Sequence, residues 1–318
     1  MDTLSGFLDG PRARQAFLLR SLLDPPWSLR IRDEAPLTVV AMVRGRCWVC
    51  YDDAPPVAIE PGGVAVIRGP DHYTVADDPA TPPQIVIHPA QVCTTPDGVS
   101  LSEAMSLGLR TWGTDPDGEH VVLTGTYTTD GEVSRRLLDA LPRLTVLGPG
   151  EWASPVVPLL AGEITRDEPG QEAVLDRLLD LVLVDALRTA FARPDAAVPA
   201  WYRAAGDPVV GPAVRLLQDD PGRPWTVAAL AAEVGASRAA LARRFHAVVG
   251  EPPMAYLASW RLALAADLLL EPGASVTAVA RRVGYGSPFT FSTAFKRSFG
   301  ASPRTYRDAR LPSASHTG

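Results

Sequence analysis

Residues 276–307 read VTAVARRVGYGSPFTFSTAFKRSFGASPRTYR, and this stretch decides the fold of the C-terminal part of the chain. With one extra residue, it repeats the stretch 227–256, VAALAAEVGASRAALARRFHAVVGEPPMAY. So many shared positions indicate one structural unit that occurs twice. The eleven positions that carry the same or a similarly apolar residue are Val227, Leu230, Ala231, Val234, Gly235, Ser237, Leu241, Phe245, Gly250, Pro253 and Tyr256 in the first copy, and Val276, Val279, Ala280, Val283, Gly284, Ser287, Phe291, Phe295, Gly300, Pro303 and Tyr306 in the second.

Each copy predicts a helix, a tight turn and a second helix. Apolar residues three, four and seven positions apart line one face of a short helix at the start of each copy. In the first copy Gly235 then supplies the turn, and Ser237 stands where the next helix needs an N-cap. That helix ends at Gly250, and Pro253 begins another. The sequence therefore predicts an all-α domain with two helix-turn-helix units.

A continuous helix is expected between the two units. Residues 254–270 carry Leu257, Trp260, Leu264 and Leu268 at helical spacing, which predicts one buried face. At 1.5 Å per residue this helix is ~25 Å long. It can therefore hold the two units about one turn of B-DNA apart, roughly 34 Å.

The charge is unevenly distributed along the chain. The formal net charge is −6, but residues 206–310 contain 13 Arg and Lys against 8 Asp and Glu. This part therefore carries about +5 and the rest of the chain about −11. A basic domain on an acidic protein is the pattern expected when only that domain approaches phosphates. The charge pattern predicts double-stranded DNA as the partner of the C-terminal domain.

Residues 212–310 resemble the DNA-binding domain of the AraC/XylS family of bacterial regulators, through the segments 237–270 and 276–307. The resemblance implies that the second helix of each unit enters a major groove, in two successive grooves on one face of the DNA. The outward-facing residues of these two helices are the candidate DNA contacts. They are Ser237, Arg238, Ala239, Ala242, Arg243 and Arg244 in the first unit, and Ser287, Pro288, Phe289, Thr290, Ser292, Thr293, Lys296 and Arg297 in the second.

Arg243 is the first candidate for a base contact, because a guanidinium can bond O6 and N7 of guanine together. A phosphate contact or a solvated charge is the alternative for each of these arginines. The second unit departs from the family at Thr293, where other members carry a basic or amide side chain. This departure predicts that the second unit reads bases weakly and serves mainly to hold phosphates or to touch RNA polymerase.

Short apolar runs separated by Pro, Gly and Asp dominate the N-terminal part, with no helical period. Strands at this spacing are typical of a small antiparallel barrel or sandwich. The runs are WSLRIRD (27–33), LTVVAMVRGRCWVCYD (37–52), VAIEPGGVAVIRGP (57–70), HYTVAD (72–77), QIVIHP (84–89) and, after a polar loop, EHVVLTGTYTTD (119–130).

The run 43–78 resembles the cupin-like sensor domain of some AraC/XylS regulators, which carries a Gly before a Cys-Trp pair, then a Pro-Gly turn and a histidine. Here these are Gly45, Cys47-Trp48, Pro61-Gly62 and His72. The resemblance implies a multidomain α and β protein, with a cupin-like β-barrel before the all-α double helix-turn-helix domain. Metal-binding cupins place two histidines on one strand, where this chain has Cys47 and Cys50. This departure counts against a metal enzyme, and we expect no cofactor.

Five residues of this domain are candidates for sensing a ligand or a redox signal. Our first hypothesis is oxidation of Cys47 or its pairing with Cys93, because the resemblance includes regulators that respond to oxidants through cysteines. Cys47 and Cys50 lie three apart on one strand and face opposite sides, so we expect no bridge between them. The alternatives are buried cysteines that act as small apolar residues, a barrel that binds an apolar metabolite, and a soft-metal site of mixed ligands. The candidates are Cys47, Cys50, His72, His88 and Cys93.

Residues 171–193 carry a broad apolar stripe at helical spacing, which predicts a long helix. The stripe is wide enough to pack on the barrel and on a second copy of itself, so we expect a homodimer through this helix. A helix buried only within its own domain is the alternative. We expect a sensor and dimerisation domain over 1–193, a linker over 194–211, the DNA-binding domain over 212–310 and a disordered tail over 311–318.

Together these features predict a sequence-specific transcription regulator that responds to a small-molecule or redox signal, and an activator because most AraC/XylS members are. No secretory signal and no membrane-spanning stretch is recognised, so we expect a cytoplasmic protein. A cupin-type metal-dependent enzyme with a helical appendage is the rival, but it leaves the internal repeat unexplained. A DNA-binding protein with a purely structural barrel is a third possibility.

Overall fold

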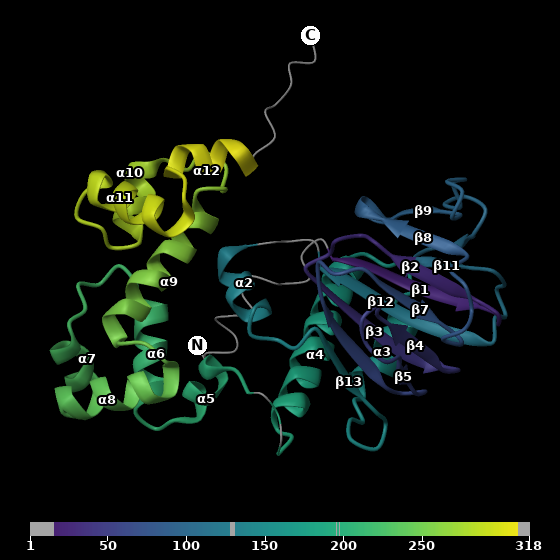
Figure 1. Ribbon diagram of the computed structural model, residues 1–318, viewed down its shortest axis with the longest axis horizontal. Helices are drawn as coiled ribbons and strands as arrows, with labels where there is room; N and C mark the ends of the chain where they lie inside the picture. Colours follow the sequence, from purple (N-terminus) through teal and green to yellow (C-terminus); the bar gives the residue numbers. More distant parts are fainter. Residues whose placement is uncertain (1–15, 128–130, 195, 197, 311–318) are drawn as a thin grey trace, which may run out of the picture. The chain divides into compact units, whose positions relative to one another are not determined.

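The computed structural model describes residues 16–127, 131–194, 196 and 198–310, which divide into two compact units (Figure 1). The strand-rich unit contains the described residues up to 127 and those of 141–196. The helical unit contains residues 131–140 and 198–310. Within the described residues, the helical unit therefore takes in a short segment first and the whole C-terminal part later.

Two sheets form the strand-rich unit within the described residues. Their strand orders are β10-β11-β1-β12-β3-β6-β13 and β5-β4-β7-β2-β8-β9, and neighbours are antiparallel except for the β1·β11 and β2·β8 pairs. The first sheet comprises β10 (Ser106–Gly108), β11 (Thr111–Gly113), β1 (Phe17–Leu23), β12 (His120–Tyr127), β3 (Leu37–Arg44), β6 (Val64–Arg68) and β13 (Leu144–Leu147). The second comprises β5 (Val57–Ile59), β4 (Cys47–Cys50), β7 (Tyr73–Ala76), β2 (Ser28–Ile31), β8 (Ile85–His88) and β9 (Val92–Thr94), with a short 3-10 helix, η1 (Pro89–Gln91), before β9.

The core of this unit lies between the two sheets. One buried cluster combines Val40 and Met42 of β3 with Val49 and Val75 of the other sheet. Along β4, Cys47 and Val49 are buried while the residues between and after them are half-buried, because alternate residues of a strand face opposite sides. Within the described residues the runs predicted as strands are confirmed, and so is the sheet-rich N-terminal domain. The expectation that all strands are antiparallel is wrong, because the β1·β11 and β2·β8 pairs are parallel.

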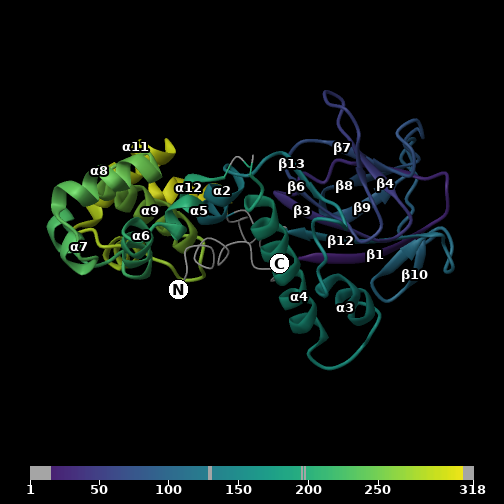
Figure 2. The ribbon, with the colours of Figure 1, turned by 90° about the horizontal axis from the view of Figure 1, so that it is seen from below.

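Two helices pack on the first sheet and lie side by side (Figure 2). They are α3 (Val156–Glu163), which contacts β3, and α4 (Gln171–Phe191), which contacts β6 and β13. A Cβ at Gly125 of β12 would lie 2.4 Å from Leu179, so this glycine lets α4 approach the sheet closely. The predicted long helix is confirmed, and most of its apolar stripe is buried against its own unit. On its outer face Val174 and Leu181 remain exposed.

The helical unit contains the two predicted helix-turn-helix units. The first is α7 (Val227–Glu233) with α8 (Arg238–Val249), and the second is α10 (Val276–Arg282) with α11 (Pro288–Phe299). Helix α9 (Pro253–Leu268) joins them, and Figure 1 shows the first pair near one end of α9 and the second pair at the other. Helix α6 (Val210–Asp219) precedes the first unit and α12 (Pro303–Arg310) follows the second. The all-α double helix-turn-helix prediction is confirmed.

Two further helices of this unit were not expected from the sequence. Helix α5 (Ala200–Gly206) forms within the range 194–211, for which we expect a linker, and packs against α6 and α8. Small residues do not mark a loop here, because they let backbones meet: a Cβ at Gly211 would lie 2.8 Å from the carbonyl oxygen of Ala204. Helix α2 (Glu132–Leu138) packs on α9, although its residues lie between β12 and β13 in the sequence.

Among the described residues, no helix is both long enough and apolar enough to cross a membrane. The segment 311–318, for which we expect disorder, lies outside these residues.

Candidate functional site

The second helix of each unit, α8 in the first and α11 in the second, is its recognition helix. The two recognition helices begin with matching caps and turns. Ser237 accepts a hydrogen bond from the amide of Ala240, and Ser287 accepts one from the amide of Thr290, each at 3.2 Å. Both serines are therefore N-caps, as predicted. Gly235 and its counterpart Gly284 have φ values of 66° and 83°, which a side chain would strain. Each unit thus begins its recognition helix with the same local geometry.

Aromatic packing holds each recognition helix from behind. In the first unit Phe245 of α8 meets Tyr256 edge to face, with ring centroids 5.7 Å apart. In the second unit Phe295 of α11 meets Tyr306 in the same way at 5.3 Å. All four side chains are buried. The repeat in sequence is therefore a repeat in packing, and it turns the opposite face of each helix to solvent.

On α8 the predicted contacts have different surroundings. Arg238, Ala239 and Arg243 are exposed, and neither arginine has an ion pair or hydrogen bond with a described residue. Ala242 is half-buried. Arg244 instead bonds Asp207 through its Nε, at 2.8 and 3.0 Å from the two carboxylate oxygens. Arg243 is thus available to DNA, whereas Arg244 is occupied within the domain.

The Asp207 carboxylate is itself built into the fold. It accepts hydrogen bonds from the amides of Val209 and Val210, both at 2.9 Å, at the start of α6. Burial raises the pKa of Asp207, but these amides and the Arg244 guanidinium outweigh it and hold the pKa below its usual value. The sequence gives no local sign of this partner, because Asp207 lies 37 residues away from Arg244.

On α11 the most exposed apolar side chain is Phe289, with 83% of its surface accessible. Pro288, Thr290, Thr293, Lys296 and Arg297 are also exposed, whereas Ser287 and Ser292 are half-buried. The Thr293 hydroxyl donates to the carbonyl oxygen of Phe289 at 3.1 Å, so only its acceptor lone pairs and its methyl group remain for a partner. An exposed Phe beside a basic side chain suits contact with a thymine methyl and a phosphate.

Sequence reasoning missed a basic pair on α10. Arg281 and Arg282 end this helix and are exposed, and Arg282 lies 3.6 Å from Glu271. The repeat itself carries the signal, because the equivalent positions in the first unit are Ala232 and Glu233. The second unit is therefore more basic beside its recognition helix than the first.

The loop before the first unit and the turn of the second meet at Arg261 of α9. Its guanidinium donates to the carbonyl oxygens of Pro221, at 2.6 Å, and Arg223, at 2.8 Å. A Cβ at Gly284 would lie 2.8 Å from this guanidinium and equally close to the carbonyl of Gly222. The glycine therefore allows a contact that fixes the second unit against the first.

All three cysteines of the strand-rich unit are free thiols in environments that disfavour the thiolate. Burial raises the pKa of Cys47 to about 12, with a smaller contribution from Cys50. Burial also raises the pKa of Cys50 and of Cys93, both of which are half-buried. The thiolate is the reactive form of cysteine, so burial disfavours reaction at Cys47.

The predicted histidines are not brought together. His72 is exposed, and half-buried His88 bonds the Thr94 hydroxyl at 3.0 Å. No group of three or more His, Cys, Asp or Glu side chains in the described part of the chain is arranged to hold a metal ion. The geometry therefore does not favour the mixed soft-metal site considered from the sequence.

The histidine that the sequence did not single out is His120, on β12. It is buried, and its Nδ1 accepts a hydrogen bond from the Trp27 indole at 3.0 Å, with the two rings edge to face. Gly45 has φ of 80°, and a Cβ there would lie 2.3 Å from the His120 ring. The glycine of the cupin-like motif thus makes room for the histidine that orients Trp27.

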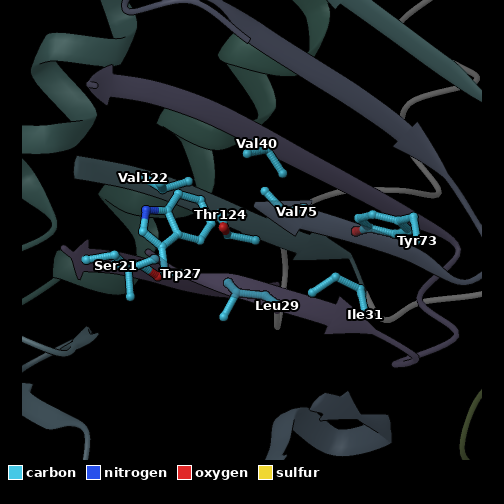
Figure 3. A pocket seen from close by; sticks show the side chains of 10 residues that line it. Ser21, Trp27, Leu29, Ile31, Val40, Tyr73, Val75, Val122 and Thr124 are labelled. Carbon is cyan, nitrogen blue, oxygen red and sulfur yellow. The ribbon is translucent and has the colours of Figure 1, made fainter. Parts of the chain in front are cut away.

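Trp27 borders a small cavity inside the strand-rich unit. Figure 3 shows its indole at one end and Tyr73 at the other, with aliphatic side chains between them. The cavity has a volume of about 40 Å³, and its few polar groups include the hydroxyls of Ser21 and Thr124. The remaining lining residues are Leu23, Leu29, Ile31, Val40, Val75 and Val122. A small, mainly apolar molecule with one polar group matches this lining.

Comparisons with known proteins agree with both halves of the chain. Residues 2–192 match a family described as Cupin, and residues 230–309 match one described as Helix-turn-helix domain. The chain is 30% identical over 321 residues to an AraC-like transcription regulator of Streptomyces antibioticus, over 98% of this chain and 100% of the relative. It is 30% identical over 181 residues to RclR of Escherichia coli (strain K12), an RCS-specific HTH-type transcriptional activator, over 55% of this chain and 63% of the relative. The solved DNA-binding domain of AdpA, a global transcriptional factor in complex with a target DNA, is 34% identical, covers 33% of this chain and 93% of that chain, and has a TM-score of 0.31.

Proposed function

Because this chain belongs to the AraC-like family of transcription regulators, which bind DNA through a helix-turn-helix domain, we propose that a small apolar ligand in its cupin domain controls how that domain binds DNA. The DNA-binding part of this proposal rests on the pair of equally capped recognition helices, each with exposed side chains on its outer face. Arg238 and Arg243 serve the first unit, and Phe289, Lys296 and Arg297 serve the second. Arg244, tied to Asp207, acts through the fold instead of touching DNA.

The test is binding of the full chain to duplexes selected from random DNA, measured over a range of salt concentrations. The excess basic charge must displace counterions, so we expect affinity to fall roughly 100-fold between about 50 and 200 mM salt. At any one salt concentration, scrambling the selected sequence should also lower the affinity, and by a larger factor than the change of salt does. Affinity that is flat with salt, or equal for selected and scrambled DNA, would count against DNA reading by these helices.

A ligand is favoured over an oxidant as the signal because of where the candidate residues lie. The cavity is mainly apolar, bordered by Trp27 and lined by both sheets. The Cys47 thiol is buried, and burial raises its pKa. At about 40 Å³ the cavity holds only a few atoms before it expands. Binding would therefore push the sheets apart, and a packed interior transmits such a displacement.

A thermal-denaturation screen of small apolar compounds distinguishes the two signals. We expect compounds that raise the melting temperature of the wild type and of Cys47→Ser, but not of Val75→Ile, whose extra methylene fills the cavity. The thiol oxidant diamide should leave DNA affinity unchanged in the wild type. If diamide changes that affinity and Cys47→Ser abolishes the change, the signal is redox and the ligand proposal fails.

The protein acts as a homodimer in this proposal, through the outer face of α4. Val174 and Leu181 lie seven residues apart on that face and are 43% and 47% exposed, and Leu159 of α3 adds 52%. Two copies of this apolar surface would bury each other. The inner stripe of α4 is used within its own unit, so only these outer side chains remain for a partner.

We further propose that the protein activates transcription, touches RNA polymerase, has no enzymatic activity and works in the cytoplasm, where the DNA lies. RclR, similar over about half of this chain, is a transcriptional activator by its name, which supports the first point. The relatives named above are regulators, which supports a non-catalytic cupin domain. The surface of α11 beyond its DNA-facing residues is the proposed contact with polymerase.

A further inference from the structure

Helix α2 is an unexpected part of the helical unit. Its residues lie between β12 and β13 in the sequence, within the stretch that matches the cupin family. Yet Val133, Ser134 and Leu138 are buried, and the helix packs on α9. Seven residues from the stretch that matches the cupin family therefore belong to the helical unit.

Asp267 of α9 caps this helix. Its two carboxylate oxygens accept hydrogen bonds from the amides of Glu132, at 2.6 Å, and Val133, at 3.1 Å. Gly131 lets the capping residue approach, since a Cβ there would lie 3.2 Å from both oxygens. A carboxylate on two otherwise unpaired amides at a helix N-terminus is a strong, charge-assisted contact.

Glu132 connects α2 to the helix that follows the second helix-turn-helix unit. Its Oε1 accepts a hydrogen bond from the Tyr306 hydroxyl at 2.9 Å, in a buried position. Burial and this carboxylate both raise the pKa of Tyr306, so the hydroxyl keeps its proton and remains the donor. Tyr306 packs edge to face on Phe295 of the recognition helix. A continuous chain of contacts thus runs from Asp267 through α2 to α11.

The internal repeat shows what is special about this arrangement. The residue equivalent to Asp267 in the first unit is Gln218, 49 positions earlier, and the equivalent of Tyr306 is Tyr256. Gln218 donates directly to the Tyr256 hydroxyl at 2.8 Å. In the first unit the helix before and the helix after are therefore bridged directly. In the second unit the N-terminus of α2 is inserted into the bridge.

We infer that α2 is the positioning helix of the second unit, and that Glu132 and Asp267 are positioning residues for DNA reading by α11. The inference rests on the proposal that both units read DNA. It also gives the sensor domain a connection to the second unit. Val122 and Thr124 of β12 line the cavity, and α2 is the next element after β12 in the sequence. In the first unit the Gln218–Tyr256 bridge is complete without α2.

The test compares two matched hydroxyl deletions in the full chain, Tyr306→Phe and Tyr256→Phe. Each keeps its aromatic ring and removes one hydroxyl, so both should fold. Each unit is expected to contact its own part of the selected DNA, called its half-site. Binding is measured on the selected DNA and on two versions, in each of which one half-site is scrambled. The half-site whose scrambling no longer matters in Arg243→Ala is the half-site of the first unit. We expect Tyr306→Phe to lose ~10-fold of the discrimination at the second half-site and none at the first. Tyr256→Phe should show the reverse.

A second measurement follows the contact itself by hydrogen exchange of the full chain. Asp267→Ala should speed exchange in residues 131–138 and 303–310, with partial recovery in Asp267→Asn, which keeps one acceptor oxygen. Gln218→Ala should leave both segments protected. Unchanged exchange in Asp267→Ala, or unchanged second half-site discrimination in Tyr306→Phe, overturns the inference. A wild type that discriminates at only one half-site overturns both the inference and the proposed reading by two units.

Discussion

Replacing Arg243 by alanine is expected to weaken binding to the selected DNA sequence by about 1–3 kcal/mol, or roughly 5- to 150-fold. Arg243 lies on the exposed face of α8, and no described residue bonds its guanidinium. The Ser237 cap and the buried Phe245 hold the helix that carries it. The loss should therefore come from the missing DNA contact and not from a displaced helix.

Two variants identify the kind of contact that Arg243 makes. Arg243→Lys keeps the charge but cannot bond two acceptors of guanine together, so it should lose discrimination while keeping the salt dependence. Arg244→Ala is the matched control, because its partly exposed pair with Asp207 contributes ~0–1 kcal/mol to stability and no base contact. If Arg243→Ala weakens selected and random DNA equally, Arg243 is a phosphate contact.

Gly45→Ala is expected to destabilise the strand-rich unit by about 2–5 kcal/mol. The backbone at φ of 80° costs an L side chain ~1–2 kcal/mol. The new Cβ would also overlap the His120 ring, 2.3 Å away, and relieving such an overlap costs ~1–3 kcal/mol. Because His120 holds the Trp27 indole, displacement of the ring should also change Trp27 fluorescence before global unfolding.

Gly98→Ala is the matched control for this prediction. Gly98 has a similar φ of 92°, but a Cβ there would meet nothing within 4 Å. It should therefore show only the backbone cost, ~1–2 kcal/mol in urea unfolding. Equal losses in Gly45→Ala and Gly98→Ala would mean that the His120 ring moves aside freely.

The C-terminal fold could be predicted from the sequence because its rules are local. Caps such as Ser237, turn glycines such as Gly235 and apolar spacing act within one helix or one turn, and the repeat states each of them twice. The recognition helices and their exposed faces follow directly. The predicted strands are likewise recognisable from short apolar runs between turn residues.

What the sequence could not reveal depends on contacts between distant segments. The Trp27–His120 bond spans 93 residues, and the Glu132–Tyr306 bond spans 174. Neither residue of such a pair looks unusual beside its sequence neighbours. Helix α2 is too short to leave a clear periodic pattern, and it is stabilised by a cap that comes from another helix. The reactivity of Cys47 was equally hidden, since it depends on how completely the two sheets enclose the thiol.

Helix α9 joins the two units, and Arg261 on it bonds the loop before the first unit, so α9 fixes the distance between the two recognition helices. Successive base pairs of B-DNA are rotated by roughly 35° about the DNA axis. One base pair inserted between the two sites therefore turns the second site away from the face of the DNA on which the first site lies. Base changes in an operator can be compensated by changes on α8 or α11, whereas a change of spacing would need a different α9. In the proposed reading of DNA by both units, operators of this regulator can therefore vary in sequence but must keep the spacing between the two sites.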